Sequence, residues 1–224
     1  MIYILLFLSV FLGASVVFFI KLNKHYTKLL LAFSGAFLLA IVVFHLLPEV
    51  YSSISDTKKI GVFIAFGMFV QMILEFFSNG VEHGHVHNHN HKNTIPISLL
   101  LSLFLHAFIE GMPITSYDNS FLFGIVIHKL PIAIVVTTFL LTSNVSTIKT
   151  LGLLLLFALM APLGSFVGEN VAFLHENHQY IAAIVIGMLT HVSTTILYES
   201  SENHKFNLLK FSIVLLAFSI AYFI

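Results

Sequence analysis

The sequence predicts an all-α integral membrane protein with eight transmembrane helices, and three observations support this prediction. Hydrophobic residues make up 58% of the 224 residues and charged residues only 9%, whereas a soluble domain carries about 25% charged residues. The mean hydropathy is +0.99. Apolar stretches long enough to cross a hydrocarbon core of roughly 30 Å recur along the whole chain. Cysteine is absent, which excludes disulfides and thiolate metal ligands.

Polar breaks separate the apolar stretches and set the expected helices in order. The first stretch has no basic segment before it and no small-residue cleavage site after it, so we interpret it as a span rather than a signal peptide. Lysines precede the second and third stretches, a histidine-rich segment precedes the fourth, a turn near Asp118 precedes the fifth, and short polar links precede the last three. The expected helices cover 2–20, 29–48, 59–77, 95–115, 120–141, 149–168, 180–199 and 206–224.

The distribution of lysine predicts the orientation. If the N-terminus is outside, the cytoplasmic links hold seven of the ten basic residues, the outer links hold two, and Lys129 lies within a span. By the positive-inside rule, both termini are therefore expected outside the membrane. The links are too short for a soluble module, so 1–224 is expected to form a single polytopic domain with a cytoplasmic histidine-rich loop at 78–94.

Ionisable residues in the middle of two neighbouring spans predict a functional site. His106 and Glu110 are four residues apart, so they share one face of a helix. His106 and His128 both lie roughly 15–18 Å from the turn that joins their helices, about half of the hydrocarbon core. Two imidazoles and one carboxylate are thus expected at the same depth, where they suit a divalent metal ion. The alternative is a hydrogen-bonded pair that only ties helices together.

Lys129 is unusual because a bare ammonium at mid-membrane needs an anionic neighbour or loses its proton. Glu110 is its expected partner. In this interpretation the lysine fixes a carboxylate beside a metal ion and takes the place of a second cation. The alternative is that Lys129 reaches toward water along its own stem, which is difficult from this depth.

Further polar residues lie near the ends of other spans. His45 and Glu49 repeat the four-residue spacing at the outer end of the second span, and an entrance site and a solvated helix end remain equal alternatives. Glu75 and Glu199 lie near inner ends and are either exit-side relays or wetted termini. His191, in the seventh span, is expected to make an interhelical hydrogen bond, with metal ligation as the alternative.

The link after the third span carries a tract of five alternating histidines. Such a flexible tract binds borderline ions such as Zn²⁺, Ni²⁺ or Cu²⁺ without a rigid geometry. A solubilising polar loop is the alternative interpretation. The tract residues are His83, His85, His87, His89 and His91.

At these motifs the chain resembles the ZIP (Zrt/Irt-like) family of divalent-metal transporters, in a bacterial-type form. The resemblance is carried by His106-x-x-x-Glu110-Gly111, His128-Lys129-x-Pro131, His45-Leu46-Leu47-Pro48-Glu49 and Ala161-Pro162-Leu163-Gly164. It implies eight spans, outward termini, a cytoplasmic histidine-rich loop, and a metal site between the fourth and fifth spans.

The resemblance also implies which ligands this chain lacks. The fourth ligand position of the first metal site falls on Ile132, and water or His191 would have to complete the site. Two ligand positions of a second metal site fall on Ala107 and Ala161, and the third falls on Lys129. The resemblance therefore implies a single-ion site in which Lys129 stands in for the second cation.

These observations favour zinc uptake toward the cytoplasm, without catalysis or a resident cofactor. Fe²⁺, Mn²⁺, Co²⁺ and Cd²⁺ are alternative ions. A membrane-embedded zinc hydrolase acting on lipid is the alternative function, because three protein ligands and a water also suit that chemistry. The expected partners are metal ions and the bilayer of a bacterial inner membrane; nucleic acid is not expected, and a homodimer is left open.

Overall fold

The computed structural model describes residues 1–20, 23–52, 56–78, 80, 97–117, 119–143, 145–199 and 208–224. Within these ranges every regular element is helical, as predicted. The histidine tract and the turn at Asp118 lie outside the described residues. The helices are α1 (Ile2–Phe19), α2 (Lys24–Ile41), the π-helix η1 (Val42–Leu46), α3 (Leu47–Ser52), α4 (Thr57–Ser78), α5 (Ile97–Gly111), the 3₁₀-helix η3 (Ile114–Ser116), α6 (Asn119–Thr142), α7 (Thr147–Asn170), α8 (Ala172–Glu176), α9 (His178–Glu199) and α10 (Leu208–Tyr222).

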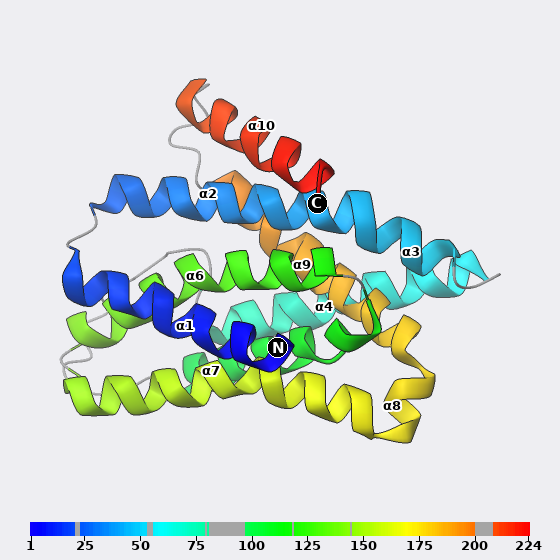
Figure 1. Ribbon diagram of the computed structural model, residues 1–224, viewed down its shortest axis with the longest axis horizontal. Coiled ribbons are helices and arrows are strands. Elements are labelled where there is room, and N and C mark those ends of the chain that lie inside the picture. Colours follow the sequence, from blue (N-terminus) through cyan, green and yellow to red (C-terminus); the bar gives the residue numbers. More distant parts are fainter. Residues whose placement is uncertain are drawn as a thin grey trace.

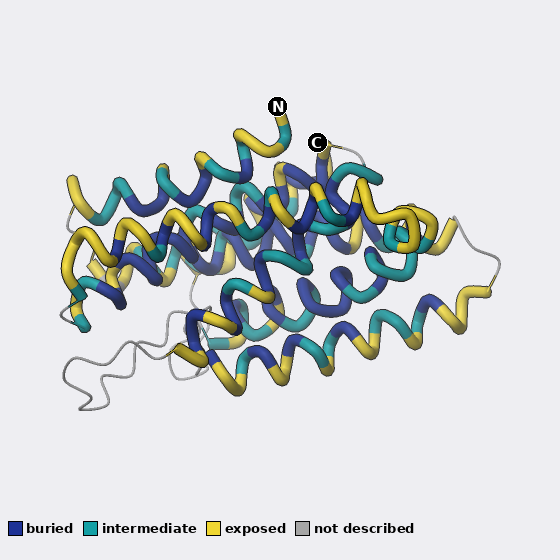
Figure 2. The backbone as a smooth tube through the Cα atoms, turned by 90° about the horizontal axis from the view of Figure 1, so that it is seen from below, coloured by how far each residue is buried: buried dark blue, intermediate teal, exposed yellow. Residues whose placement is uncertain are grey.

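The helices form an elongated bundle whose members run roughly along its long axis (Figure 1). In the described part of the chain, seven helical stretches are long and apolar enough to cross a membrane, and α10 is a shorter apolar helix of 15 residues. These eight elements correspond to the eight expected spans. The outward faces are exposed and the inward faces buried along most helices (Figure 2), as expected for a bundle whose outer surface meets lipid.

The second span differs from its expected end at Pro48. It continues without a break from α2 through η1 into α3 and ends at Ser52. Proline has no N–H to donate, so it interrupts the regular hydrogen-bond ladder of a helix. The π-turn immediately before Pro48 absorbs this irregularity, and the helix goes on for another turn.

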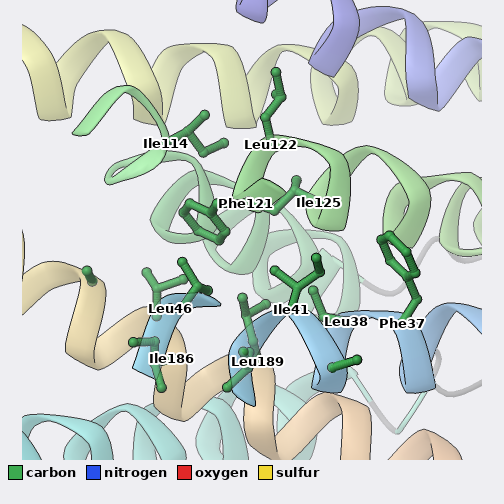
Figure 3. Packing of buried hydrophobic residues seen from close by; sticks show 14 of the residues in the cluster. Phe37, Leu38, Ile41, Leu46, Ile114, Phe121, Leu122, Ile125, Ile186 and Leu189 are labelled. Atoms are coloured by element: carbon green, nitrogen blue, oxygen red, sulfur yellow. The ribbon is translucent and has the colours of Figure 1, made fainter. Parts of the chain in front are cut away.

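The largest apolar cluster lies among α2, α6 and α9. Phe37 and Ile41 of α2, Phe121 and Ile125 of α6, and Leu189 of α9 are all fully buried in it (Figure 3). The helix α6 is the most buried of the seven spans. The packing therefore places α6 at the centre of the bundle, where α1, α2 and α7 pack around it.

Small residues let α5 approach α7 at backbone distance. A Cβ atom on Gly164 would collide with the carbonyl oxygen of Phe108, and one on Gly111 would collide with that of Ala161. Such close packing is typical of membrane helices, where small side chains allow tight backbone contact. It fixes the position of α5, the helix that carries His106 and Glu110.

Candidate metal centre

The helix α5 presents His106 and Glu110 on one buried face. Their side chains are 3% and 1% exposed, and His106 Nε2 lies 3.6 Å from Glu110 Oε2. The four-residue spacing stacks the two side chains one turn apart, as expected from the sequence. This pair is the first half of the predicted site.

The helix α6 supplies the second half. The rings of His106 and His128 lie 6.5 Å apart between centroids. Two imidazoles on one tetrahedral zinc ion, with Zn–N distances of about 2.0–2.1 Å, have centroids roughly 5 Å apart. A small rotation of the two side chains would therefore bring both rings to a shared ion.

Lys129, the next residue of α6, pairs with Glu110. The distance from Lys129 Nζ to Glu110 Oε2 is 3.1 Å, and both side chains are buried. The ammonium also lies 5.6 Å from the centre of the Phe157 ring, which favours a cation over its face. The ion pair expected between these residues is thus present, and the interpretation of Lys129 as a snorkelling side chain is wrong.

Two polar side chains from other helices hold the imidazoles. Gln71 Oε1 of α4 lies 2.8 Å from His106 Nδ1, and Ser34 Oγ of α2 lies 3.2 Å from His128 Nδ1. An amide oxygen only accepts hydrogen bonds, so His106 Nδ1 carries the proton and Nε2 is the nitrogen with a lone pair for a metal ion. Metal-binding histidines are commonly oriented in this way by a bond at the other ring nitrogen.

In the described conformation the Glu110 carboxylate is paired with Lys129 rather than positioned for a metal ion. Glu110 directs Oε2 to Lys129, while Oε1 is buried without a hydrogen-bond partner. In this arrangement no three His, Cys, Asp or Glu side chains of the described residues are positioned to hold a metal ion. Coordination by all three predicted ligands requires Glu110 to move away from Lys129 or to share its oxygens between the two cations.

The residues at the remaining implied ligand positions are apolar and buried. Ala107, Ala161 and Ile132 are 0%, 1% and 3% exposed, and they belong to the hydrophobic core. They cannot coordinate an ion. The chemistry of the centre therefore rests on two imidazoles, one carboxylate and one ammonium.

The accessory residues have specific partners in the structure. His45 Nε2 lies 2.9 Å from the carbonyl oxygen of Ala221 in α10, and His45 Nδ1 lies 3.3 Å from Ser120 Oγ. His45 thus ties the C-terminal helix to the bundle, while Glu49, one turn later, is exposed. Neither the entrance site nor its alternative is tested by these contacts.

His191 makes the expected interhelical hydrogen bond. Its Nε2 lies 2.6 Å from Glu75 Oε2 of α4, and both side chains are about a fifth exposed, 22% and 23%. Glu75 is four residues after Gln71, so the two share one face of α4. Glu199 is the last residue of α9 and is half-buried.

Sequence reasoning missed Ser34, Gln71 and the histidines near α8. Uncharged polar residues are common in apolar spans, and Gln71 and Ser34 act on histidines 35 and 94 residues away. No local pattern signals such partners. His175 and His178 were detectable as two histidines three residues apart in the polar link before the seventh expected span.

A comparison with known protein families decides the identity of this bundle. The model of the family described as ZIP Zinc transporter matches residues 79–224, more than half of the chain. The chain belongs to the ZIP zinc transporter family. No curated protein matches the sequence.

Membership of the ZIP family confirms the resemblance seen in the sequence. The protein is a multi-pass membrane transporter of divalent metal ions, zinc among them. The matched region contains α5 and α6, which carry His106, Glu110, His128 and Lys129. Nothing in the comparison supports the alternative of a lipid hydrolase.

Proposed function

We propose that this ZIP protein imports Zn²⁺ toward the cytoplasm through a centre made by His106, Glu110 and His128. The observation that carries the proposal is the meeting of two buried imidazoles and a buried carboxylate, with each imidazole hydrogen-bonded at Nδ1. Neutral imidazole nitrogens and a carboxylate oxygen are preferred zinc ligands. Fe²⁺, Mn²⁺, Co²⁺ and Cd²⁺ remain alternative cargo for the same donor set.

Lys129 gives the centre a way to remain neutral between transport events. In the described conformation its ammonium compensates the charge of Glu110. An incoming Zn²⁺ ion replaces the ammonium as the partner of Glu110, and the ammonium returns when the ion leaves. A buried carboxylate without a cation would be costly, and the exchange keeps Glu110 paired with a cation in both states.

Glu75 and His191 form a second polar pair beside the centre. Gln71 touches His106, and Glu75 lies one turn further along the same face of α4. The centre and the second polar pair are therefore linked by neighbouring residues of α4. We place the exit of the ion along this face of α4, toward its C-terminal end at Ser78.

The proposed direction of transport is described relative to a proposed orientation in the membrane. Seven lysines lie in or beside the links assigned to the cytoplasm and two beside an outer link, which supports an orientation with both termini outside. The whole chain then forms one polytopic domain, and the tract at 83–91 faces the cytoplasm. There it would gather ions after transit, in a bacterial inner membrane or its equivalent.

Zinc flux into proteoliposomes tests the proposed centre. We expect His106→Ala, Glu110→Ala and His128→Ala each to abolish saturable zinc uptake, because each removes a ligand from a site that has only three. His25→Ala is the matched control, since His25 is an exposed histidine at one end of α2 and should leave uptake unchanged. Wild-type uptake by the His106→Ala, Glu110→Ala double variant would refute the proposal.

A further inference from the structure

Two histidines meet at the junction of α8 and α9, outside the proposed transport centre. His175 lies in the last turn of α8, and His178 is the first residue of α9. Their ring centroids are 6.3 Å apart, with an angle of 37° between the ring planes. This spacing is close to that of His106 and His128, so a small side-chain rotation would also bring these two rings to one ion.

The hydrogen bonding of His178 favours a metal-binding tautomer. Its Nδ1 lies 2.9 Å from the carbonyl oxygen of His175. A carbonyl oxygen accepts but never donates, so Nδ1 carries the hydrogen and Nε2 of the neutral ring has a lone pair. A bond from Nδ1–H to a backbone carbonyl is a common way of orienting a metal-binding histidine. His175 is exposed, and its ring can turn toward the same ion.

An aromatic ring lies beside the pair. The ring of Tyr117 lies 6.3 Å from that of His178. Burial raises the pKa of Tyr117, and the negative charge of Glu49 raises it further. Lys59 is engaged elsewhere: its Nζ donates a hydrogen bond to the Tyr180 hydroxyl at 3.0 Å and lies over the Tyr180 ring.

The pair lies at one end of the bundle. The elements α3 and α8 lie at the same end (Figure 1), opposite the end where α2 begins. In the proposed orientation this is the outer end, where ions enter.

We infer that His175 and His178 form a second binding site, which captures a borderline divalent ion such as Zn²⁺ at the outer mouth. Two imidazoles select such ions over Mg²⁺ and Ca²⁺, which prefer oxygen ligands. Water completes the coordination, because only two protein side chains are supplied. An exposed, two-ligand site of this kind releases its ion readily, and this suits capture rather than storage. The binding is independent of the proposed function, whereas its role in supplying the transport centre rests on that function.

Zinc binding by the full chain in lipid nanodiscs tests the site directly. The five tract histidines are first changed to serine, so that they do not contribute, and Zn²⁺ is then titrated by calorimetry. We expect His175→Ala, His178→Ala to remove one bound ion per chain, while His25→Ala, a change to an exposed histidine at the opposite end, removes none. An unchanged stoichiometry in the double variant would overturn the inference. If the double variant does not fold, His175→Gln and His178→Gln are measured singly, and unchanged zinc binding in both has the same consequence.

Zinc uptake at varied external concentration tests the capture role separately. We expect the double variant to raise the KM for external Zn²⁺ about threefold or more at an unchanged maximal rate, since only the first encounter is affected. Loss of one bound ion with an unchanged KM would retain the site but refute its capture role. If the wild-type chain binds zinc at this pair but does not transport it, the proposed function fails and the binding site stands.

Discussion

Replacing Lys129 with methionine should strengthen zinc binding at the centre. Methionine keeps the length of the side chain and removes its charge. Lys129 Nζ lies 3.1 Å from Glu110 Oε2, and two opposite unit charges at that distance attract by about 5 kcal/mol at an effective dielectric constant of about 20. A zinc ion that binds Glu110 must overcome this attraction in the wild-type protein and meets no such competitor in the variant.

The expected gain is smaller than the full attraction. Breaking a buried ion pair by removing one partner costs the metal-free protein only about 3–5 kcal/mol, and zinc recovers no more than this amount when it becomes the new partner of Glu110. A buried carboxylate without a cation also tends to take up a proton, which zinc must then displace. We therefore expect zinc affinity to rise at least about tenfold, equivalent to about 1.4 kcal/mol, with the largest gain above neutral pH.

Zinc titrations of the protein in nanodiscs, at several pH values, measure this effect. The five tract histidines are replaced by serine in every sample, so that only the remaining sites bind. Thr137→Val is the control, because Thr137 is a fully buried residue of α6 whose hydroxyl donates to the carbonyl of Ala133 in its own helix. The variant should also melt at a lower temperature than the wild type without zinc and recover with zinc. Unchanged or weaker zinc affinity in Lys129→Met at all pH values would refute the reasoning.

Three further predictions concern the packing of α5 against α7, the positioning of His106 by Gln71, and the histidine tract. Gly164→Ala should lower the free energy of unfolding by about 1–3 kcal/mol, because the added methyl group meets backbone of α5, whereas Gly152→Ala on the same helix has open space and should be neutral in a thermal melt. Gln71→Leu should weaken zinc affinity about 10–100-fold by releasing His106, and titration of folded protein checks this. Serine at all five tract positions should leave substantial zinc uptake, and complete loss of uptake with normal expression would instead place the tract on the transport route.

The helices could be predicted from the sequence because each span is a long apolar run with polar ends. The bilayer requires backbone hydrogen bonds to be satisfied within the span, so such runs have few alternatives to the helix. The details that were not predicted depend on tertiary contacts. The continuation of the second span past Pro48 needs the π-turn at Val42–Leu46, and the short helix α8 packs against α7 and α9.

In the candidate site, too, some features could be predicted from the sequence and others depend on tertiary packing. His106 and Glu110 share a face through local helix geometry, and His128 reaches the same depth through the lengths of two neighbouring helices. Both arguments use only distances along the chain. The bond from Gln71 depends instead on the packing of α4 beside α5, which no periodicity in the sequence encodes.

Lys129 leads to a last prediction, on the number of ions at the centre. Its ammonium already occupies one side of Glu110, and Ala107 and Ala161 offer no ligands on that side. A second Zn²⁺ ion there would face a permanent cation in a buried site, without donors to compensate the repulsion. We therefore expect a zinc-soaked structure to contain a single ion at the centre, held by His106, Glu110 and His128. Lys129 Nζ should then be displaced from Glu110 Oε2. Two zinc ions bridged by Glu110 in the unmodified protein would contradict this. The same competition limits how tightly the first ion is held, and a transport site needs such a limit because the ion must also leave.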